Sequence, residues 1–227
     1  MAYAQLVRLP NVFTAIADPL AGWFVIGGGE PSWQLPLLLG ASACLYTAGV
    51  VLNDCFDCER DRIERPERPL PRGTIERGTA YCLAFGLMGV GLMLAVLASK
   101  VVLGVAAFLA AMIFFYDAWA REIPALRPLV LGCCRFTNFL LGMRCAPPRF
   151  WVFPAVLGIY VAMLTFVSQR EVENPKLRVI VKRLLLGIIV VDAALVAVAP
   201  MGNWMGACLV LSLLIPAAVL SKVLAMT

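Results

Sequence analysis

Residues 53–73 read NDCFDCERDRIERPERPLPRG and directly follow an apolar run. Asp54, Asp57 and Asp61 are three and four residues apart, so on an α-helix they share one face. Three like charges on one face repel one another and make ionisation costly. A bound cation removes that cost, and Mg²⁺ is normally held by a few carboxylates together with substrate phosphates. The stretch therefore predicts a Mg²⁺ site at the end of an apolar helix.

The rest of the chain is strongly apolar. Of its 227 residues 62% are hydrophobic, and the mean hydropathy is +0.88. The apolar residues form long blocks with few charges, which is the pattern of transmembrane helices. The first block, Leu9 to Ile26, carries Asp18 and Pro19 and lacks a signal-peptide cleavage pattern, so we interpret it as a membrane helix. We expect an all-α integral membrane protein, a multi-helix bundle with one transmembrane domain over residues 1–227.

The distribution of basic residues predicts the topology. Eight spans are expected, at residues 9–26, 35–53, 79–98, 101–117, 126–143, 150–167, 181–199 and 203–221. Eight spans place both termini on one side, and fifteen Lys and Arg residues fall on that side against three on the other. Such a bias marks the cytoplasmic face. We therefore expect a multi-pass protein of the cytoplasmic membrane with both termini in the cytoplasm.

Composition also excludes several kinds of chemistry. The chain has no histidine, which removes Ser-His, Cys-His and His-zinc mechanisms. Eight cysteines are present, but a zinc site needs four well-placed ligands, and the pair Cys55 and Cys58 lacks two partners. The net charge of +5 does not indicate nucleic acid, because the basic residues lie in short loops between apolar blocks. Without histidine, a general base supplied by the chain would have to be a carboxylate or a tyrosine.

An arginine- and proline-rich segment follows the aspartates, at residues 65–73. Its prolines end the helix and favour an extended turn. Its arginines, Arg68 and Arg72 among them, are planar and permanently charged donors that suit diphosphate oxygens. A solvated loop whose arginines set the topology is the plainer alternative.

NDxxDxxxD followed by RPxRPLPxG resembles the first motif of the UbiA superfamily of intramembrane prenyltransferases. The helical layout is also similar, with acidic loops after the second and sixth helices and a faint repeat (Arg8-Leu-Pro-Asn11 and Arg135-Phe-Thr-Asn138) that suggests pseudo-symmetric halves. The segments GCCRFTNFLLGM and SQREVE resemble the EboC-like branch. The resemblance implies an α-helical membrane enzyme that uses Mg²⁺ to transfer a polyprenyl group from its diphosphate to an acceptor.

The resemblance also assigns roles by position. Asn53, Asp54, Asp57 and Asp61 would form the first metal–diphosphate site and are the expected catalytic residues. Asn11 matches a polar residue near the start of the first helix, and Tyr116 and Arg121 match a tyrosine followed by a basic residue. With the loop arginines and two polar residues of the fifth span, the expected substrate-binding residues are Asn11, Arg68, Arg72, Tyr116, Arg121, Arg135 and Asn138.

The second motif departs from the family pattern. Members usually carry a DxxxD-type cluster after the sixth helix and have nine spans, whereas this chain has residues 168–173, SQREVE, and eight expected spans. Glu171 is the expected metal ligand there. Glu173 lies two residues on, and i and i+2 positions do not share a helical face. The second motif therefore supplies fewer carboxylates for metal binding than the first.

Four polar residues lie inside apolar spans. Charges at membrane depth are costly and tend to face a cavity or a partner. Arg135 and Asn138 either contact the diphosphate or acceptor, or clamp neighbouring helices through Asp18 or Asp192. The sequence leaves both interpretations open.

The expected function is Mg²⁺-dependent transfer of a prenyl group from a prenyl diphosphate to an unknown acceptor within the membrane. One alternative keeps the fold but binds or transports a lipid-linked precursor. Another transfers a non-prenyl group to or from a polyprenyl phosphate. A phosphatidyl-group transferase of the CDP-alcohol class is disfavoured, because Asp57-Cys58 and the following residues lack its DG step, its AR pair and its second DxxxD.

Overall fold

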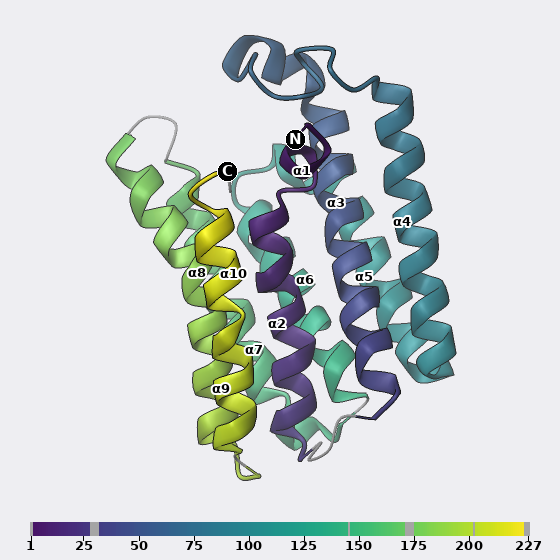
Figure 1. Cartoon of the computed structure of the whole chain (residues 1–227), viewed down its shortest axis with the longest axis vertical. Coiled ribbons are helices and arrows are strands. Elements are labelled where there is room, and N and C mark those ends of the chain that lie inside the picture. Colours follow the sequence, from purple (N-terminus) through teal and green to yellow (C-terminus); the bar gives the residue numbers. More distant parts are fainter. Residues whose placement is uncertain (1, 28–31, 145, 171–174, 202, 225–227) are drawn as a thin grey trace.

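The computed structural model describes residues 2–27, 32–144, 146–170, 175–201 and 203–224, and no strand occurs within them. The helices, shown in Figure 1, are α1 (Ala2–Leu6), α2 (Leu9–Val25), α3 (Gln34–Glu64), α4 (Arg77–Ala98), α5 (Lys100–Ala118), η1 (Ala120–Glu122), α6 (Leu126–Met143), η2 (Pro148–Phe150), α7 (Val152–Ser168), α8 (Pro175–Val198), α9 (Trp204–Ser212) and α10 (Leu214–Leu220). The expected all-α fold is confirmed.

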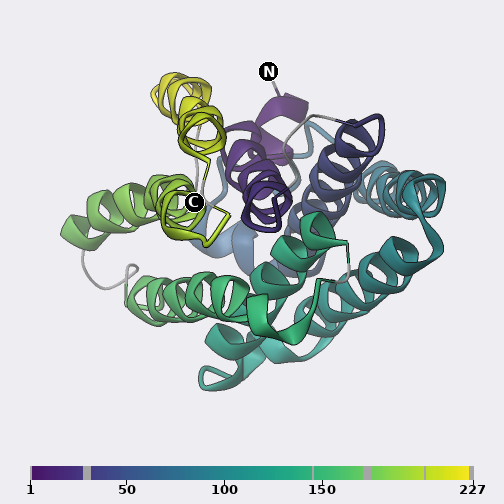
Figure 2. The same ribbon diagram turned by 90° about the horizontal axis from the view of Figure 1, so that it is seen from below.

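The long helices run roughly antiparallel to their neighbours and form one closed bundle (Figures 1 and 2). From α3 to α9 each helix packs against the next along the chain, and α10 packs back against α2. Helix α2 also contacts α3, α6, α8 and α9, so it lies at the centre of the packing. Helix α1 and the C-terminal end of α10 lie toward the end of the bundle where α3 ends, as an even number of spans requires (Figure 1).

The helices agree with the eight expected spans, with one correction. The span expected at 203–221 is two helices, broken at Leu213. Pro216 explains the break, because it has no N–H to donate to the carbonyl of Ser212 and its ring crowds that carbonyl. By length and composition, α3, α4, α5 and residues 148–168 are long and apolar enough to cross a membrane, and Trp204–Leu220 is a shorter apolar stretch. Pseudo-symmetry of the halves stays a prediction.

The proline inside α2 shapes the centre of the bundle. Pro19 cannot donate to the carbonyl of Ala15. Ser42 of α3 and Asn138 of α6 donate to that oxygen instead, each at 2.8 Å. Satisfying a freed carbonyl from neighbouring helices is what makes a kinking proline tolerable at membrane depth. The exchange fixes α3 and α6 against the same turn of α2.

Glycines let α2 and α6 approach each other closely toward the C-terminal end of α2. A Cβ on Gly142 would lie 1.9 Å from the carbonyl oxygen of Pro19, and one on Gly22 would lie 2.3 Å from that of Phe139. Small residues at such crossings are typical of membrane helix pairs. The contact closes the bundle at the end opposite the aspartates.

Candidate functional site

A cavity of about 520 Å³ opens at the end of the bundle where α3 ends. Helices α3, α5, α6, α7 and α8 contribute side chains to it, together with the start of α2 and the loop after α3. Nine of the expected site residues line it: Asn11, Asn53, Asp57, Asp61, Arg68, Tyr116, Arg121, Arg135 and Asn138. Segments far apart in the sequence thus meet at one site.

Helix α3 carries the acidic motif because it continues past its apolar run to Glu64. Pro66 then ends it, since the residue before a proline avoids the helical conformation. Asp54, Asp57 and Asp61 are all buried, with exposed fractions of 5, 6 and 3%. Charges buried to this extent require partners.

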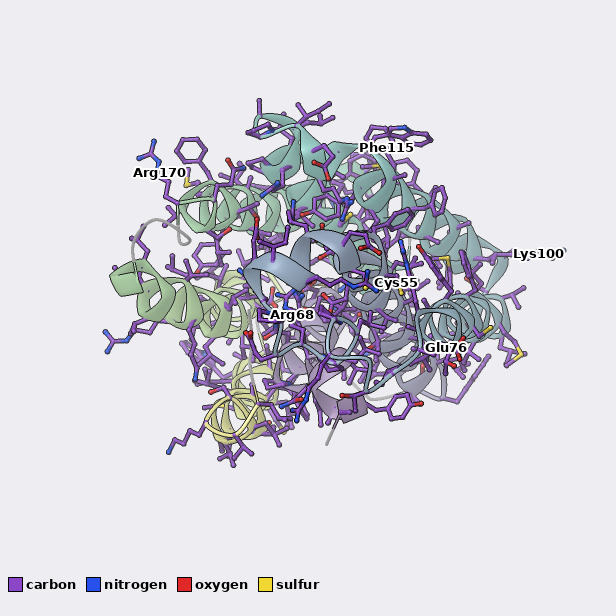
Figure 3. All side chains as sticks on the ribbon, turned by 90° about the horizontal axis from the view of Figure 1, so that it is seen from above. Cys55, Arg68, Glu76, Lys100, Phe115 and Arg170 are labelled. Carbon is purple, nitrogen blue, oxygen red and sulfur yellow. The ribbon has the colours of Figure 1, made fainter. Side chains whose placement is uncertain are left out.

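Arginines from outside α3 supply two of those partners. Arg8, between α1 and α2, contacts Asp54 at 2.6 Å. Arg68, in the loop after α3, contacts Asp61 at 2.6 Å and Asp54 at 3.4 Å. Figure 3, which views the molecule from this end, shows Arg68 near the middle of the bundle. Asp54 therefore faces two arginines, and it is the one aspartate of the motif that does not line the cavity.

Asp57 is held from two other directions. Arg121 of η1 donates to its Oδ1 from across the cavity, and Arg60 contacts it at 2.9 Å from one turn along α3. The Arg121 guanidinium also lies 5.5 Å from the ring centre of Phe56, an arrangement that favours a cation over an aromatic face. The arginines that contact the motif thus come from the loop after α3, from the segment before α2 and from the α5–α6 connection.

The loop that carries Arg68 is anchored by apolar residues and one glycine. Leu70 and Ile75 are buried in a cluster with Leu6 of α1. Gly73 has a φ of +73°, a conformation that side chains rarely adopt, and donates to the carbonyl of Leu70 at 3.0 Å. Arg72 is exposed and does not line the cavity, so the structure does not bring it to the site.

Asp117, which the sequence reasoning missed, lies beside the motif. It is 1% exposed, lines the cavity and accepts a hydrogen bond from Asn53 at 3.2 Å. The sequence feature that could have identified it is a carboxylate at the end of an apolar helix, between Tyr116 and Arg121. Arg8 was also missed, although it opens the RLPN repeat.

Arg135 and Asn138 act as a clamp between α6 and α2. Arg135 contacts both carboxylate oxygens of Asp18 at 3.1 and 3.2 Å and donates to the carbonyl of Thr14 at 3.0 Å. Asn138 donates to Asp18 at 2.8 Å. The sequence left Asp18 and Asp192 as possible partners of Arg135. In the structure Arg135 pairs with Asp18, and Asp192 is buried on α8.

The deeper wall of the cavity is apolar. It is formed by side chains that include Leu109, Ile113, Leu131, Val161, Leu164 and Ile188. Tyr116 also lines the cavity, next to Asp117 and three residues after Ile113 on α5. The neighbouring Phe114, Phe115 and Trp119 are exposed on the outside of the bundle. The cavity therefore offers both charged and apolar side chains to a ligand.

Cys55 and Cys58 lie in the apolar cluster under the loop, which agrees with a packing role. Glu171 and Glu173 lie outside the described residues.

The oxygen donors fit Mg²⁺ in chemistry. Within the described ranges no three Asp, Glu, His or Cys side chains are gathered as a ready metal cage. Mg²⁺ does not need one, because one or two carboxylates and substrate phosphates suffice. Asp117 lines the cavity, and its buried Oδ2 has no hydrogen-bond partner in the part of the chain that the structure describes. An unpartnered carboxyl oxygen near Asn53 and Asp57 is a group that a hard cation can bind.

The structure is a helical bundle with helices long and apolar enough to cross a membrane, and its cavity is lined by both charged and apolar side chains. The family model of the UbiA prenyltransferase family matches residues 15–226, so the chain belongs to that family. The family resemblance expected from the first motif is confirmed.

Named relatives agree with this. The chain is 30% identical to the digeranylgeranylglyceryl phosphate synthase of Methanothrix thermoacetophila over 177 residues. This match covers 77% of the chain and 66% of the relative. It is 27% identical over 178 residues to the enzyme of the same name from Methanopyrus kandleri, covering 76% and 64%. The chain spans about two thirds of the length of these relatives. A solved UbiA homologue from Archaeoglobus fulgidus, bound to DMAPP and Mg²⁺, shares the fold with a TM-score of 0.68 at 15% identity, over 98% of this chain and 88% of that one.

Proposed function

We propose that this chain catalyses Mg²⁺-dependent transfer of a prenyl group from a prenyl diphosphate to an acceptor within the membrane. The observation that carries the proposal is a single cavity that joins buried carboxylates and arginines to an apolar wall. A prenyl diphosphate has the same division, because its head is anionic and its tail is hydrocarbon. The UbiA family match and the named relatives support the same reaction class.

Bound Mg²⁺ would neutralise the diphosphate and make it a better leaving group. Asp57 and Asp61 line the cavity and would hold the ion, with Asn53 beside them. Asp54 is the third proposed ligand of this motif. All three aspartates would first have to release the arginines that they contact in the structure. Glu171 stays a proposed ligand from the second motif.

The arginines give the site a second set of groups for the head of the substrate. In the structure Arg8, Arg68 and Arg121 each contact a buried aspartate. Their donors can turn to diphosphate oxygens, since a guanidinium binds carboxylate and phosphate with the same planar geometry. Exchange of partners would keep the buried charges compensated before and after binding. Arg68 and Arg121 are therefore proposed diphosphate residues.

The apolar wall would hold the tail and exclude water from the reacting carbon. Departure of the diphosphate breaks the bond from C1 to oxygen, with the electron pair leaving on the diphosphate, and an acceptor atom then bonds to the allylic carbon and loses its proton. Tyr116, which lines the cavity next to Asp117, would position C1. Asn11, Arg135 and Asn138 line the same cavity and are proposed to bound the acceptor side.

The names of the relatives suggest a first acceptor to test. Their product carries two geranylgeranyl groups on glyceryl phosphate, which implies transfer of geranylgeranyl to a glyceryl phosphate. The proposed location is the cytoplasmic membrane with both termini in the cytoplasm, because fifteen of nineteen basic residues fall on the terminal side of the predicted spans.

Labelled prenyl diphosphates of several chain lengths, supplied with Mg²⁺ to membranes containing the chain, test the proposal. Asp57→Asn and Asp61→Asn should each lower turnover by at least about a hundredfold, since each removes an anionic ligand of the Mg²⁺ that would compensate the reacting head group. Glu59→Gln is the matched control, because Glu59 lies on the exposed face of the same helix and pairs with Arg62.

Mg²⁺-dependent turnover by the parent that falls in both aspartate variants and survives in the control supports prenyl transfer. Binding without turnover, for every chain length and acceptor, would instead favour a carrier of a lipid-linked precursor. Equal binding and turnover in parent and variants would contradict the metal site.

A further inference from the structure

Asp117 is the buried acid of the cavity that the family motif does not explain. It is the penultimate residue of α5, and it faces α3 through the hydrogen bond from Asn53 to its Oδ1. Its other oxygen, Oδ2, has no hydrogen-bond partner among the described residues. The residue is 1% exposed, so bulk water does not solvate that oxygen.

Arg121, the cation nearest to Asp117 along the chain, is already paired with other carboxylates. Arg121 follows Asp117 by four residues, and its guanidinium contacts Asp57 and Glu122. Asn53, the one residue that donates to Asp117 in the described structure, lies four residues before Asp57 and shares its helical face. Asp117 and Asp57 are therefore presented to the same part of the cavity from α5 and α3. A buried carboxylate with one amide donor is costly to hold as an anion unless a proton or a metal joins it.

We infer that Asp117 is a further Mg²⁺ ligand, which supplies an oxygen from α5 to an ion that Asp57 and the substrate phosphates also hold. The inference rests on the proposed function and deepens it. It gives the site a carboxylate from a second helix, the feature that residues 168–173 provide only thinly in sequence. Asn53 would then orient Asp117 through the bond to Oδ1 and leave Oδ2 for the ion, as partners of metal-binding carboxylates commonly do.

Metal binding is measured apart from turnover, on the purified chain in detergent with Mg²⁺ and inorganic pyrophosphate. Because a ligand that binds only the folded chain raises its melting temperature, a Mg²⁺ titration of the melting temperature gives the half-saturating concentration. Asp117→Asn should raise that concentration at least about tenfold, by the loss of one charged ligand. Asp57→Asn is the positive comparison, and Glu59→Gln is the control on the exposed face of α3.

Two further measurements separate a ligand from a structural residue. In EDTA, Asp117→Asn should melt at or above the temperature of the parent, because an amide is less costly to bury than an unpartnered carboxylate. Asp117→Ala, which buries no polar group and suits a helix, should show the same Mg²⁺ shift. Asp117→Glu keeps the charge and should stay within about threefold of the parent.

The outcomes are distinct. A parent that shows no Mg²⁺-dependent stabilisation with pyrophosphate overturns the proposed function and this inference together. If the parent and Asp57→Asn behave as expected but neither Asp117→Asn nor Asp117→Ala shifts the Mg²⁺ midpoint, the inference alone fails. Loss of turnover with an unchanged midpoint would make Asp117 a proton acceptor and would also overturn it.

Discussion

The clamp between Arg135 and Asp18 gives a prediction whose size follows from the structure. Arg135 donates to both oxygens of Asp18, which is fully buried, and to the carbonyl of Thr14. Arg135→Gln removes the only cation that the described structure places on this carboxylate. Breaking a buried ion pair from one side costs about 3–5 kcal/mol, because an uncompensated charge remains buried. The free energy of unfolding should fall by that amount.

The double variant Asp18→Asn with Arg135→Gln supplies the internal control. Two neutral amides leave neither member of the Arg135–Asp18 pair as an uncompensated charge, so most of the lost stability should return. A double-mutant cycle should give a coupling energy of about 2–3 kcal/mol. Unfolding of the purified chain in mixed micelles with a denaturing detergent, followed by circular dichroism, measures all four proteins.

One result would refute the reasoning. If Arg135→Gln changes the free energy of unfolding by less than about 0.5 kcal/mol, the size of an ordinary surface substitution, Arg135 does not clamp the helices. Weaker prenyl diphosphate binding in that stable variant would then identify Arg135 as a substrate residue. The sequence left these two roles open, and the experiment distinguishes them.

Two further substitutions follow from the backbone. Gly142→Ala should destabilise the chain by about 2–3 kcal/mol in the same unfolding assay, because its Cβ would lie 1.9 Å from the carbonyl oxygen of Pro19; Gly104→Ala, with no atom within 4 Å, should not, and equal losses would contradict the close crossing. Arg8→Gly should lower stability only slightly, because relief of a φ of 46°, worth roughly 1 kcal/mol, offsets part of the lost ion pair with Asp54, which keeps Arg68 at 3.4 Å. It should also raise the Kd for prenyl diphosphate about tenfold by deleting the guanidinium that contacts Asp54, and an unchanged Kd would remove Arg8 from the site.

The first motif was predictable because its information is local. The spacing of Asp54, Asp57 and Asp61 follows from the helical repeat, and the end of α3 follows from Pro66. The burial of all three aspartates agrees with the expectation that they form a site rather than a solvated surface. The arginine-rich loop was likewise expected to reach back, and Arg68 does so.

Other parts of the site could not be predicted from the local sequence. Arg72 and Arg68 have the same local chemistry, yet only Arg68 reaches the cavity, because Leu70 and Gly73 set the course of the loop. Asp117 was overlooked because one carboxylate in an apolar helix has no periodic pattern. Its significance depends on Asn53, sixty-four residues earlier in the chain.

The sequence by itself determined the membrane helices, the acidic face of α3 and the family, because hydropathy, helical periodicity and proline act over a few residues. The tertiary structure alone decided which arginine compensates which aspartate: Arg8 with Asp54, Arg121 with Asp57, and Arg135 with Asp18. Each of these pairs joins residues at least forty-six positions apart. Buried charges can be satisfied by any cation that packing brings within reach, and packing depends on how all the helices fit together.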